Sequence, residues 1–385
     1  MVRLANILQI LVIVVFLAAP YGLPLLGVSG GRLAVENRPV APVPPLAEAV
    51  DAPGRYGPAL AAHVRDAAPF RDHLIRANNR LRLALFGESP VPGVIVGRDG
   101  WLYYNLEHAL DDYLNVVPLS ERDMAEMVRV QVARRDWLAE RGIAYQIMFA
   151  PNKERVYPEH LPPGLRPLRP ESRLSQIVPR LRAAGLDVLD LREAVTAGKA
   201  AGRTYMKTDT HWNGYGGLLG ASALIAALAP RFPAMELLNP EAYELVVTDR
   251  PGGDLSEMLL LPDVWREPDV SARPRGAVLA RPAAPGDYPD PADHPDRERA
   301  AYETDRKDWP RAVFFHDSFI RAMQAHAAER FSRSVFLWTH ALAPAIIEKE
   351  RPDVVVLEVV ERYVFALFVN NQEDRAKPAL SESVQ

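Results

Sequence analysis

The stretch AVFFHDSF, residues 312–319, decides the fold class, because an apolar strand passes through one short turn into a helix. Strands without polar alternation are typical of a parallel sheet that helices cover on both faces. In open α/β sheets, ligands bind beyond the carboxyl ends of the strands. Ser318 follows such a strand and is therefore a candidate site residue. The alternative is that Asp317 or Ser318 serves only as the N-cap of the helix that follows.

Helices and strands alternate on both sides of this stretch. The periodicity predicts strands over 144–150, 187–191, 334–338 and 353–360, and helices over 120–141, 171–184, 214–228, 319–331 and 344–349. Ser120 is the expected N-cap of the first of these helices. This alternation predicts an α/β fold with three layers and a mostly parallel sheet.

The N-terminal segment is predicted to lie outside the folded domain. The run from Leu4 to Val28 is almost wholly apolar, and no charged residue occurs between Arg3 and Arg32. About twenty apolar residues span a bilayer as a helix, and Arg3 favours a cytoplasmic N-terminus. Residues 1–29 are therefore expected to be a transmembrane anchor or, alternatively, a cleaved signal segment. Both interpretations predict that the rest of the chain is exported.

The remaining chain divides by composition. Residues 30–58 are rich in proline and are expected to form an extended stalk. Residues 59–370 are expected to form the catalytic domain, which includes a hairpin at 94–103 with an Asp-Gly turn. Residues from about 252 to 310 lack periodicity and are expected to be a surface insertion. Residues 371–385 are expected to be a flexible tail.

Composition excludes several functional classes. A formal net charge of −4 argues against nucleic-acid binding, for which a basic surface is expected. The absence of cysteine excludes disulfides, thiolate zinc sites and cysteine nucleophiles. The nine histidines lack a metal-ligand spacing, so neither a metal nor a cofactor is predicted.

A second stretch, TDTHWN at residues 208–213, complements Ser318 chemically. A serine hydroxyl becomes a nucleophile when an imidazole takes its proton and a carboxylate orients that imidazole. Asp209 and His211 lie two residues apart, so an extended or tightly turned segment could bring both side chains to one side. The alternative for this stretch is an Asx-type turn with a surface histidine.

Other polar residues lie at the ends of predicted strands. Asn152 and Lys153 follow the strand at 144–150, where they could face a pocket or support a turn. Arg362 follows the strand at 353–360, where it could form an internal ion pair or contact a substrate. Together with Asn213, these residues are the candidates for oxyanion or substrate contacts.

Seven motifs resemble the SGNH-hydrolase-like proteins related to the alginate O-acetyltransferases AlgJ and AlgX. They are ENR at 36–38, VGRDGWLY at 96–103, APNKERVYPEHLP at 150–162, TDTHWN at 208–213, GDL at 253–255, HDSF at 316–319, and the segment 352–362 from PDVV to ER. They occur in the family order and span most of the chain. His316 departs from the pattern, because many SGNH proteins have glycine there. No carbohydrate-binding module is predicted after the catalytic region, which favours the membrane-anchored AlgJ type.

The resemblance implies an SGNH-like fold and an O-acetyltransferase that moves acetyl groups onto hydroxyls of an exported polysaccharide. In that family an Asp-x-His element precedes the serine, which implies Ser318 as nucleophile, His211 as general base and Asp209 as the residue that orients His211. The implied partners are the polysaccharide acceptor and a multi-pass membrane O-acyltransferase that delivers acetyl groups. The implied location is a bacterial inner membrane, with the catalytic domain in the periplasm or outside the cell.

Two other functions fit the same residues. A polysaccharide or small-ester deacetylase would use an identical triad, because only the acceptor differs between water and a sugar hydroxyl. A non-catalytic scaffold of a polysaccharide export complex is the third possibility. The presence of Asp209, His211 and Ser318 together disfavours the scaffold.

Overall fold

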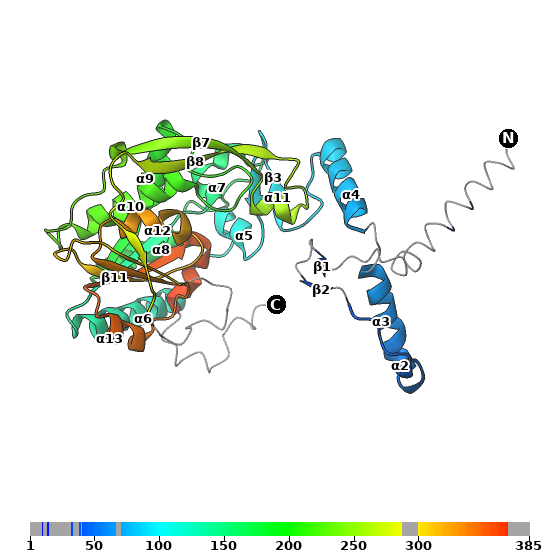
Figure 1. Cartoon of the computed structure of the whole chain (residues 1–385), viewed down its shortest axis with the longest axis horizontal. Helices are drawn as coiled ribbons and strands as arrows, with labels where there is room; N and C mark the ends of the chain where they lie inside the picture. The colour runs from blue at the N-terminus through cyan, green and yellow to red at the C-terminus, as the bar shows by residue number, and fades with distance from the viewer. Residues whose placement is uncertain are drawn as a thin grey trace. The chain divides into compact units, whose positions relative to one another are not determined.

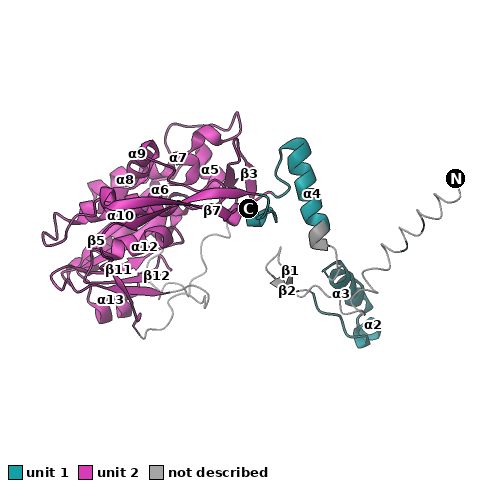
Figure 2. Ribbon diagram, turned by 45° about the horizontal axis from the view of Figure 1, so that its top comes forward, with its two compact units in different colours: residues 1–91, 256–264 teal, residues 92–255, 265–385 magenta. Residues whose placement is uncertain are grey.

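The computed structural model describes Ile10, Val14 and residues 32–33, 38–39, 41–66, 71–286 and 299–368 (Figure 1). The chain separates into two compact units (Figure 2). Unit 1 comprises residues 1–91 and 256–264, and unit 2 comprises residues 92–255 and 265–385. The unit that carries the central sheet therefore begins at Pro92, whereas periodicity suggested a start at residue 59.

Much of the described part of unit 1 is helical, and it also has one short pair of strands. It contains β1 (Arg32–Leu33), β2 (Arg38–Pro39), α2 (Ala47–Asp51), α3 (Pro53–Asp66) and α4 (Arg71–Phe86). Residues 47–58, part of the predicted extended stalk, are largely helical here. Pro53 is the first residue of α3, a position that does not need its missing N–H.

The expected anchor or signal at residues 1–29 lies outside the described residues, apart from Ile10 and Val14. The expected tail at 371–385 lies outside them as well. In the described parts of the chain, no helix has the length and apolar character needed to cross a membrane.

Unit 2 is built on a seven-stranded sheet, which confirms the predicted α/β class. Its strands, in spatial order, are β6 (Asp187–Asp190), β5 (Ala144–Ala150), β13 (Val354–Val360), β11 (Arg311–Phe315), β12 (Arg333–Leu337), β10 (Ala300–Glu303) and β9 (Arg281–Ala283). The first five are parallel, whereas β10 and β9 pair in antiparallel fashion. The carboxyl ends of the five parallel strands therefore lie along one edge.

Helices cover both faces of this sheet and complete three layers (Figure 1). One layer contains α7 (Lys153–Val156), α9 (Arg192–Ala197), α10 (Gly214–Leu228) and α12 (Ile320–Ala328); the other contains α6 (Glu121–Ala139), α8 (Arg173–Ala183), α13 (Pro344–Glu350) and η4 (Glu361–Phe368). Along β13, Val354 and Val356 pack in the first layer, and Val355 and Leu357 pack in the second. Both faces of the strand are buried, which explains its unbroken apolar sequence.

Smaller elements surround the sheet. They are β3 (Val94–Val96), β4 (Leu102–Tyr104), α5 (Ala109–Leu114), η1 (Pro158–His160), η2 (Gly198–Ala200), η3 (Pro240–Ala242), β7 (Tyr243–Pro251), α11 (Asp254–Met258) and β8 (Arg266–Pro274). β3 and β4 form the expected hairpin, and Asp99 and Gly100 in its turn have φ angles of 57° and 79°. Positive φ at both positions matches the twist of a tight hairpin.

The segment from 252 to 310 contains more regular structure than its sequence predicted. β8 pairs with β7 over nine residues, and β9 and β10 extend the edge of the sheet. The prolines of β8 made this segment look like a loop in the sequence. A two-stranded ribbon has only edge strands, however, and proline is tolerated in edge strands. Pro268, for example, lies opposite Asp249.

Candidate active site

Several of the predicted site residues follow strands whose carboxyl ends lie along one edge of the sheet. Ser318 follows β11, Arg362 follows β13, and Asn152 and Lys153 follow β5. A cavity of ≈ 550 Å³ opens beside Ser318. Its lining includes Glu107, His108, Trp338, His340, Arg362 and Tyr363. The location agrees with the general rule for ligand sites in parallel sheets.

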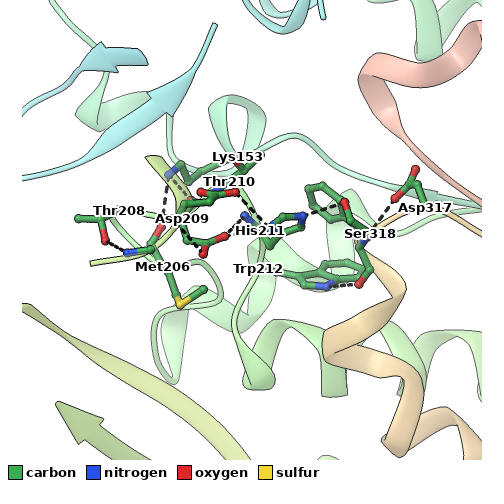
Figure 3. Close-up of polar contacts among 12 residues, drawn as sticks. Lys153, Met206, Thr208, Asp209, Thr210, His211, Trp212, Asp317 and Ser318 are labelled. Carbon is green, nitrogen blue, oxygen red and sulfur yellow. Dashed lines mark hydrogen bonds and ion pairs between the residues drawn. The ribbon is translucent and has the colours of Figure 1, made fainter. Parts of the chain in front are cut away.

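The structure brings Asp209, His211 and Ser318 together (Figure 3). Nε2 of His211 lies 2.8 Å from Oγ of Ser318, although the two residues are 107 positions apart. Nδ1 of His211 lies 2.8 Å from Oδ1 of Asp209. These distances are those of hydrogen bonds, so the three side chains form a continuous relay of acid, imidazole and hydroxyl.

The alternative capping roles are also resolved by the contacts. The backbone N–H of Phe319 donates to Oδ1 of Asp317 at 3.0 Å, so Asp317 supports the start of the helical turn. The hydroxyl of Ser318 instead faces His211. Asp209 does make the expected Asx-type turn, because its Oδ1 accepts the backbone N–H of His211 at 2.9 Å. The turn and the side-chain contact with His211 therefore coexist.

A buried tryptophan, Trp212, connects residues 206–213, here called the histidine loop, to the turn that carries Ser318. Nε1 of Trp212 donates to the carbonyl of Phe319 at 2.7 Å, and both rings are almost fully buried. The ring of Phe319 lies 5.0 Å from the ring of His211. Trp212 directly follows His211, and Phe319 directly follows Ser318. Because these two neighbours are buried and bonded to each other, the core holds His211 and Ser318 together in addition to their own hydrogen bond.

Asp209 is buried but remains a carboxylate at neutral pH. Burial raises its pKa, whereas hydrogen bonds from His211 and from the backbone N–H of Asp254 lower it and outweigh burial, giving a pKa of about 2. A negative charge beside Nδ1 fixes the tautomer in which Nε2 can accept the proton of Ser318.

A second carboxylate, Asp254, lies on the same side of His211. Its Oδ2 lies 3.5 Å from Nδ1 of His211, and burial and the charge of Asp209 raise its pKa. Asp209, His211 and Asp254 are also the described acidic and histidine residues whose ligand atoms lie within 4.8 Å of one another. A metal ion held there would occupy Nδ1, the atom that Asp209 needs in order to orient His211.

Lys153 holds the histidine loop through hydrogen bonds to its backbone carbonyls. Its Nζ donates to the carbonyls of Met206, Lys207 and Asp209 at 3.4, 3.1 and 2.6 Å. Burial lowers the pKa of Lys153 to about 8. All three ammonium protons have backbone acceptors, so this contact set holds the loop and gives Lys153 no direct contact with Ser318.

The other candidate contact residues have different roles in the fold. Asn213 caps α10: its Oδ1 accepts the N–H of Gly216 at 2.9 Å, and its Nδ2 donates to the carbonyl of Arg203 at 2.6 Å. Nδ2 of Asn152 donates to Oδ2 of Asp112 at 3.1 Å. The amide groups of both asparagines are therefore used within the protein.

Arg362 is the candidate contact residue that lines the cavity together with Ser318. Its guanidinium is mostly buried, with Nε 3.4 Å from Oε2 of Glu107 and Nη1 3.4 Å from Oδ1 of Asn152. Both contacts are long for hydrogen bonds, and the side chain also borders the cavity. Arg362 thus pairs with the exposed Glu107 and also lines the cavity beside Ser318.

Two anchoring residues were missed by the sequence interpretation. Glu267 on β8 accepts the backbone N–H of Lys207 at 2.6 Å and that of Thr208 at 3.0 Å. Asp254 accepts the N–H of Thr210 at 2.7 Å. Both lie in the segment that was expected to be a surface insertion. The string GDL at 253–255 pointed to Asp254, but no sequence signal pointed to Glu267.

Several known proteins are similar to this chain. Residues 94–285 match the family model described as SGNH hydrolase-like domain, acetyltransferase AlgX, a match that ends before Ser318. A probable alginate O-acetylase AlgJ from Pseudomonas aeruginosa is 29% identical over 279 residues, which cover 70% of this chain and 66% of that protein. The protein of the same name from Pseudomonas syringae pv. tomato is 28% identical over 240 residues, which cover 61% and 59%.

The chain thus matches less than two thirds of the length of these two relatives. Among solved structures, Bacillus cereus PatB1 superposes with a TM-score of 0.52 at 14% identity, covering 70% of this chain and 96% of that one. At this identity the likeness concerns the fold, and it agrees with the three layers described above. Residues 94–285 therefore match an SGNH hydrolase-like domain, and the chain is similar to probable alginate O-acetylases of the AlgJ type.

Proposed function

We propose that this protein is an O-acetyltransferase that moves acetyl groups onto hydroxyls of an exported polysaccharide through an acetyl-serine intermediate. The observation that carries the proposal is the pair of 2.8 Å contacts that join Asp209, His211 and Ser318. The acetyltransferase description of the matching family and the names of the AlgJ relatives support acetyl transfer as the reaction class.

In the first half-reaction, Oγ of Ser318 attacks the acetyl carbonyl of the donor while Nε2 of His211 takes the hydroxyl proton. The bond between acetyl carbon and donor then breaks, and the departing donor group receives that proton. Asp209 stabilises the imidazolium that exists between these two proton transfers. The products are acetyl-Ser318 and the deacetylated donor.

The tetrahedral intermediate needs hydrogen-bond donors for its oxyanion. Within the described chain, the backbone N–H of Ser318 has no hydrogen-bond acceptor, whereas that of Phe319 is taken by Asp317. We assign the Ser318 amide as one oxyanion donor. Arg362, which lines the same cavity, supplies positive charge nearby.

In the second half-reaction, a sugar hydroxyl gives its proton to His211 and attacks acetyl-Ser318. The ester bond to Oγ breaks, Oγ receives the proton, and the acetyl group leaves on the sugar. We further propose that the donor is presented by a multi-pass membrane O-acyltransferase, since the enzyme would work on the exported side of a bacterial inner membrane. This arrangement is what the resemblance of the sequence motifs implies.

The direct test is formation of acetyl-Ser318 from an activated acetyl ester, followed by intact mass and peptide mapping. Ser318→Ala should abolish the adduct and lower turnover by about 10⁴-fold or more, and His211→Ala should do nearly the same. Asp209→Asn should fold normally and still lose about 10²- to 10⁴-fold, because the tautomer is no longer fixed. Ser175→Ala on α8 is the matched control, since that exposed serine lies in the layer on the other face of the sheet.

The acceptor distinguishes a transferase from an esterase. When an oligosaccharide is added, a transferase should divert acetyl groups to sugar, whereas a deacetylase should release acetate at an unchanged rate. If glycan is acetylated at the wild-type rate when Ser318→Ala protein is used, either another residue is the nucleophile or the protein is only a scaffold.

A further inference from the structure

Asp254 is held against the relay by contacts on both of its carboxylate oxygens. Oδ1 accepts the backbone N–H of Thr210 at 2.7 Å, and Oδ2 lies 3.5 Å from Nδ1 of His211. The backbone N–H of Asp254 also donates to Oδ2 of Asp209 at 3.3 Å. Both carboxylates therefore lie beside Nδ1 of His211, Asp209 within hydrogen-bond distance and Asp254 slightly farther away, and the backbone N–H of Asp254 connects them.

The chain around Asp254 is fitted closely to the histidine loop. The N–H of Gly253 donates to Oγ1 of Thr208 at 2.9 Å, and the N–H of Leu255 donates to the carbonyl of Thr208 at 3.1 Å. A side chain on Gly253 would collide with Asp209. Each of residues 253–255 thus contacts the histidine loop through its backbone. These contacts fix the position of Asp254.

The charged groups around His211 determine how strongly a second carboxylate can stabilise its protonated form. Asp209 and Asp254 face its Nδ1, Ser318 faces its Nε2, and the ammonium of Lys153 lies beneath the loop. A protonated imidazole is favoured by each nearby negative charge and disfavoured by a nearby positive one. The side chain of Asp254 remains 38% exposed, so its influence is screened more than that of Asp209.

We propose that Asp254 is a second positioning residue for His211, which shares the stabilisation of the imidazolium with Asp209 and sets the pH range in which Ser318 is activated. The proposal rests on the part of the proposed function that makes Ser318 the nucleophile. It does not depend on the identity of the acetyl donor or of the acceptor.

The test uses phenylmethylsulfonyl fluoride, which modifies an activated serine without any acetyl chemistry. Oγ of Ser318 attacks sulfur, fluoride leaves, and the hydroxyl proton passes to His211 and then to solvent. The rate of adduct formation on the full chain is measured by intact mass as a function of pH. This readout reports the activation of Ser318 whether the enzyme transfers or hydrolyses acetyl groups.

Asp254→Asn should move the acid limb of this pH profile to lower pH, because one negative charge beside the imidazolium is removed. The plateau rate should fall by about 10-fold, since the base is weaker and its charged form less stabilised. Asp254→Glu should restore the position of the acid limb if the longer side chain reaches Nδ1.

Asp249→Asn on β7 is the matched control. Asp249 is exposed and pairs with Arg266 across the hairpin, so this substitution removes the same charge without touching His211. Its pH profile should coincide with that of the wild type. In an Asp209→Asn background, Asp254 is the remaining carboxylate, and its replacement should lower the rate by a larger factor than it does in the wild type.

The possible outcomes are distinguishable. If wild-type Ser318 is not modified, the proposed function fails together with this inference. If Ser318 is modified but Asp254→Asn leaves the acid limb in place, Asp254 merely supports the loop and only the inference fails. If EDTA stops modification and a divalent cation restores it, Asp209, His211 and Asp254 hold a metal and the shared role is wrong.

Discussion

At position 253 only glycine fits, because Asp209 occupies the space that a side chain would need. A Cβ atom built on Gly253 would lie against Oδ2, Cβ and Cγ of Asp209 at less than ordinary contact distances. Gly253→Ala should push Asp209 away from His211, and a misplacement of about 1 Å typically lowers the rate by about 10²-fold. The measurement is turnover of an activated acetyl ester together with the melting temperature.

Gly276→Ala is the control for this substitution, because no atom lies within 4 Å of the added Cβ at that position. It should leave both turnover and melting temperature unchanged. Wild-type turnover in Gly253→Ala would mean that the position of Asp209 is not critical for the reaction.

Asp209 should also contribute to the acid sensitivity of the fold. Burial raises its pKa, but hydrogen bonds from His211 and the Asp254 amide hold it at about 2, below the ordinary value of 3.8. The carboxylate form is thus favoured by folding, which corresponds to about 2 kcal/mol of unfolding free energy above roughly pH 4. This contribution is lost as the pH falls through about 2.

Urea unfolding of the wild type and of Asp209→Asn checks this expectation. The difference in unfolding free energy between them should be constant above roughly pH 4.5 and should shrink as the pH is lowered further. A difference that is independent of pH would show that Asp209 does not titrate below its ordinary range.

At the residue scale, the sequence predicted chemical type better than side-chain partner. Asp209, His211 and Ser318 were candidates because their residue types fit one reaction, and their contacts agree with that grouping. The partners of Lys153 were not predictable, because its three acceptors are backbone carbonyls, which leave no pattern in a sequence. Asp254 was missed for a similar reason, since its contact with Asp209 spans 45 residues.

At the element scale, the N-terminus of α10 joins stability to the site. Asn213 satisfies the N–H of Gly216 and the carbonyl of Arg203 directly after His211. Asn213→Ala should lower the unfolding free energy by about 1–2 kcal/mol, because a cap and a buried hydrogen bond are lost. Turnover at a temperature where the variant is folded should fall much less than in Asp209→Asn.

Ser172→Ala is the matched control, since Ser172 caps α8 by accepting the N–H of Ser175 at 3.1 Å. It should lower stability by a similar amount and leave turnover unchanged. If Asn213→Ala lost turnover by orders of magnitude at unchanged stability, the predicted substrate role of Asn213 would be correct and its capping role secondary.

Element types were predictable where burial imposes a pattern. The apolar runs that became β5, β11 and β13 are buried on both faces, so their sequence alone indicated parallel strands. Their spatial order was not readable, because neighbouring strands in the sheet come from distant parts of the chain. β8 was missed because its exposed positions carry arginine and proline, Arg266, Pro268 and Arg273, which also occur in loops.

At the scale of the whole molecule, domain boundaries were the least predictable feature. The helical periodicity that begins near residue 59 continues into α4, so composition placed it in the catalytic domain. Contacts instead assign residues up to Val91 to unit 1, together with 256–264. Periodicity describes the surface of a helix, and it does not tell which core that surface packs against.

We propose that the chain after residue 36 lies outside the cytoplasm, and this placement is testable on the whole protein. Arg3 precedes an uncharged apolar run that continues to Val28, and no second run of that length follows in the sequence. Short positive flanks tend to stay in the cytoplasm. A reporter that is active only outside the cytoplasm should therefore be active when it is fused after Gln385.

The control is a chain that lacks residues 4–28. A reporter that works only outside the cytoplasm should be inactive on this chain, whereas a reporter that works only inside the cytoplasm should be active on it. A full-length fusion that is active only in the cytoplasm would contradict export. The N-terminal residue of the mature protein then separates the two export routes: an intact N-terminus in the membrane fraction means an anchor, and a new N-terminus near Ala19 means a cleaved signal. An anchored enzyme would stay close to a membrane-bound acetyl donor, whereas a released one would need a donor that diffuses.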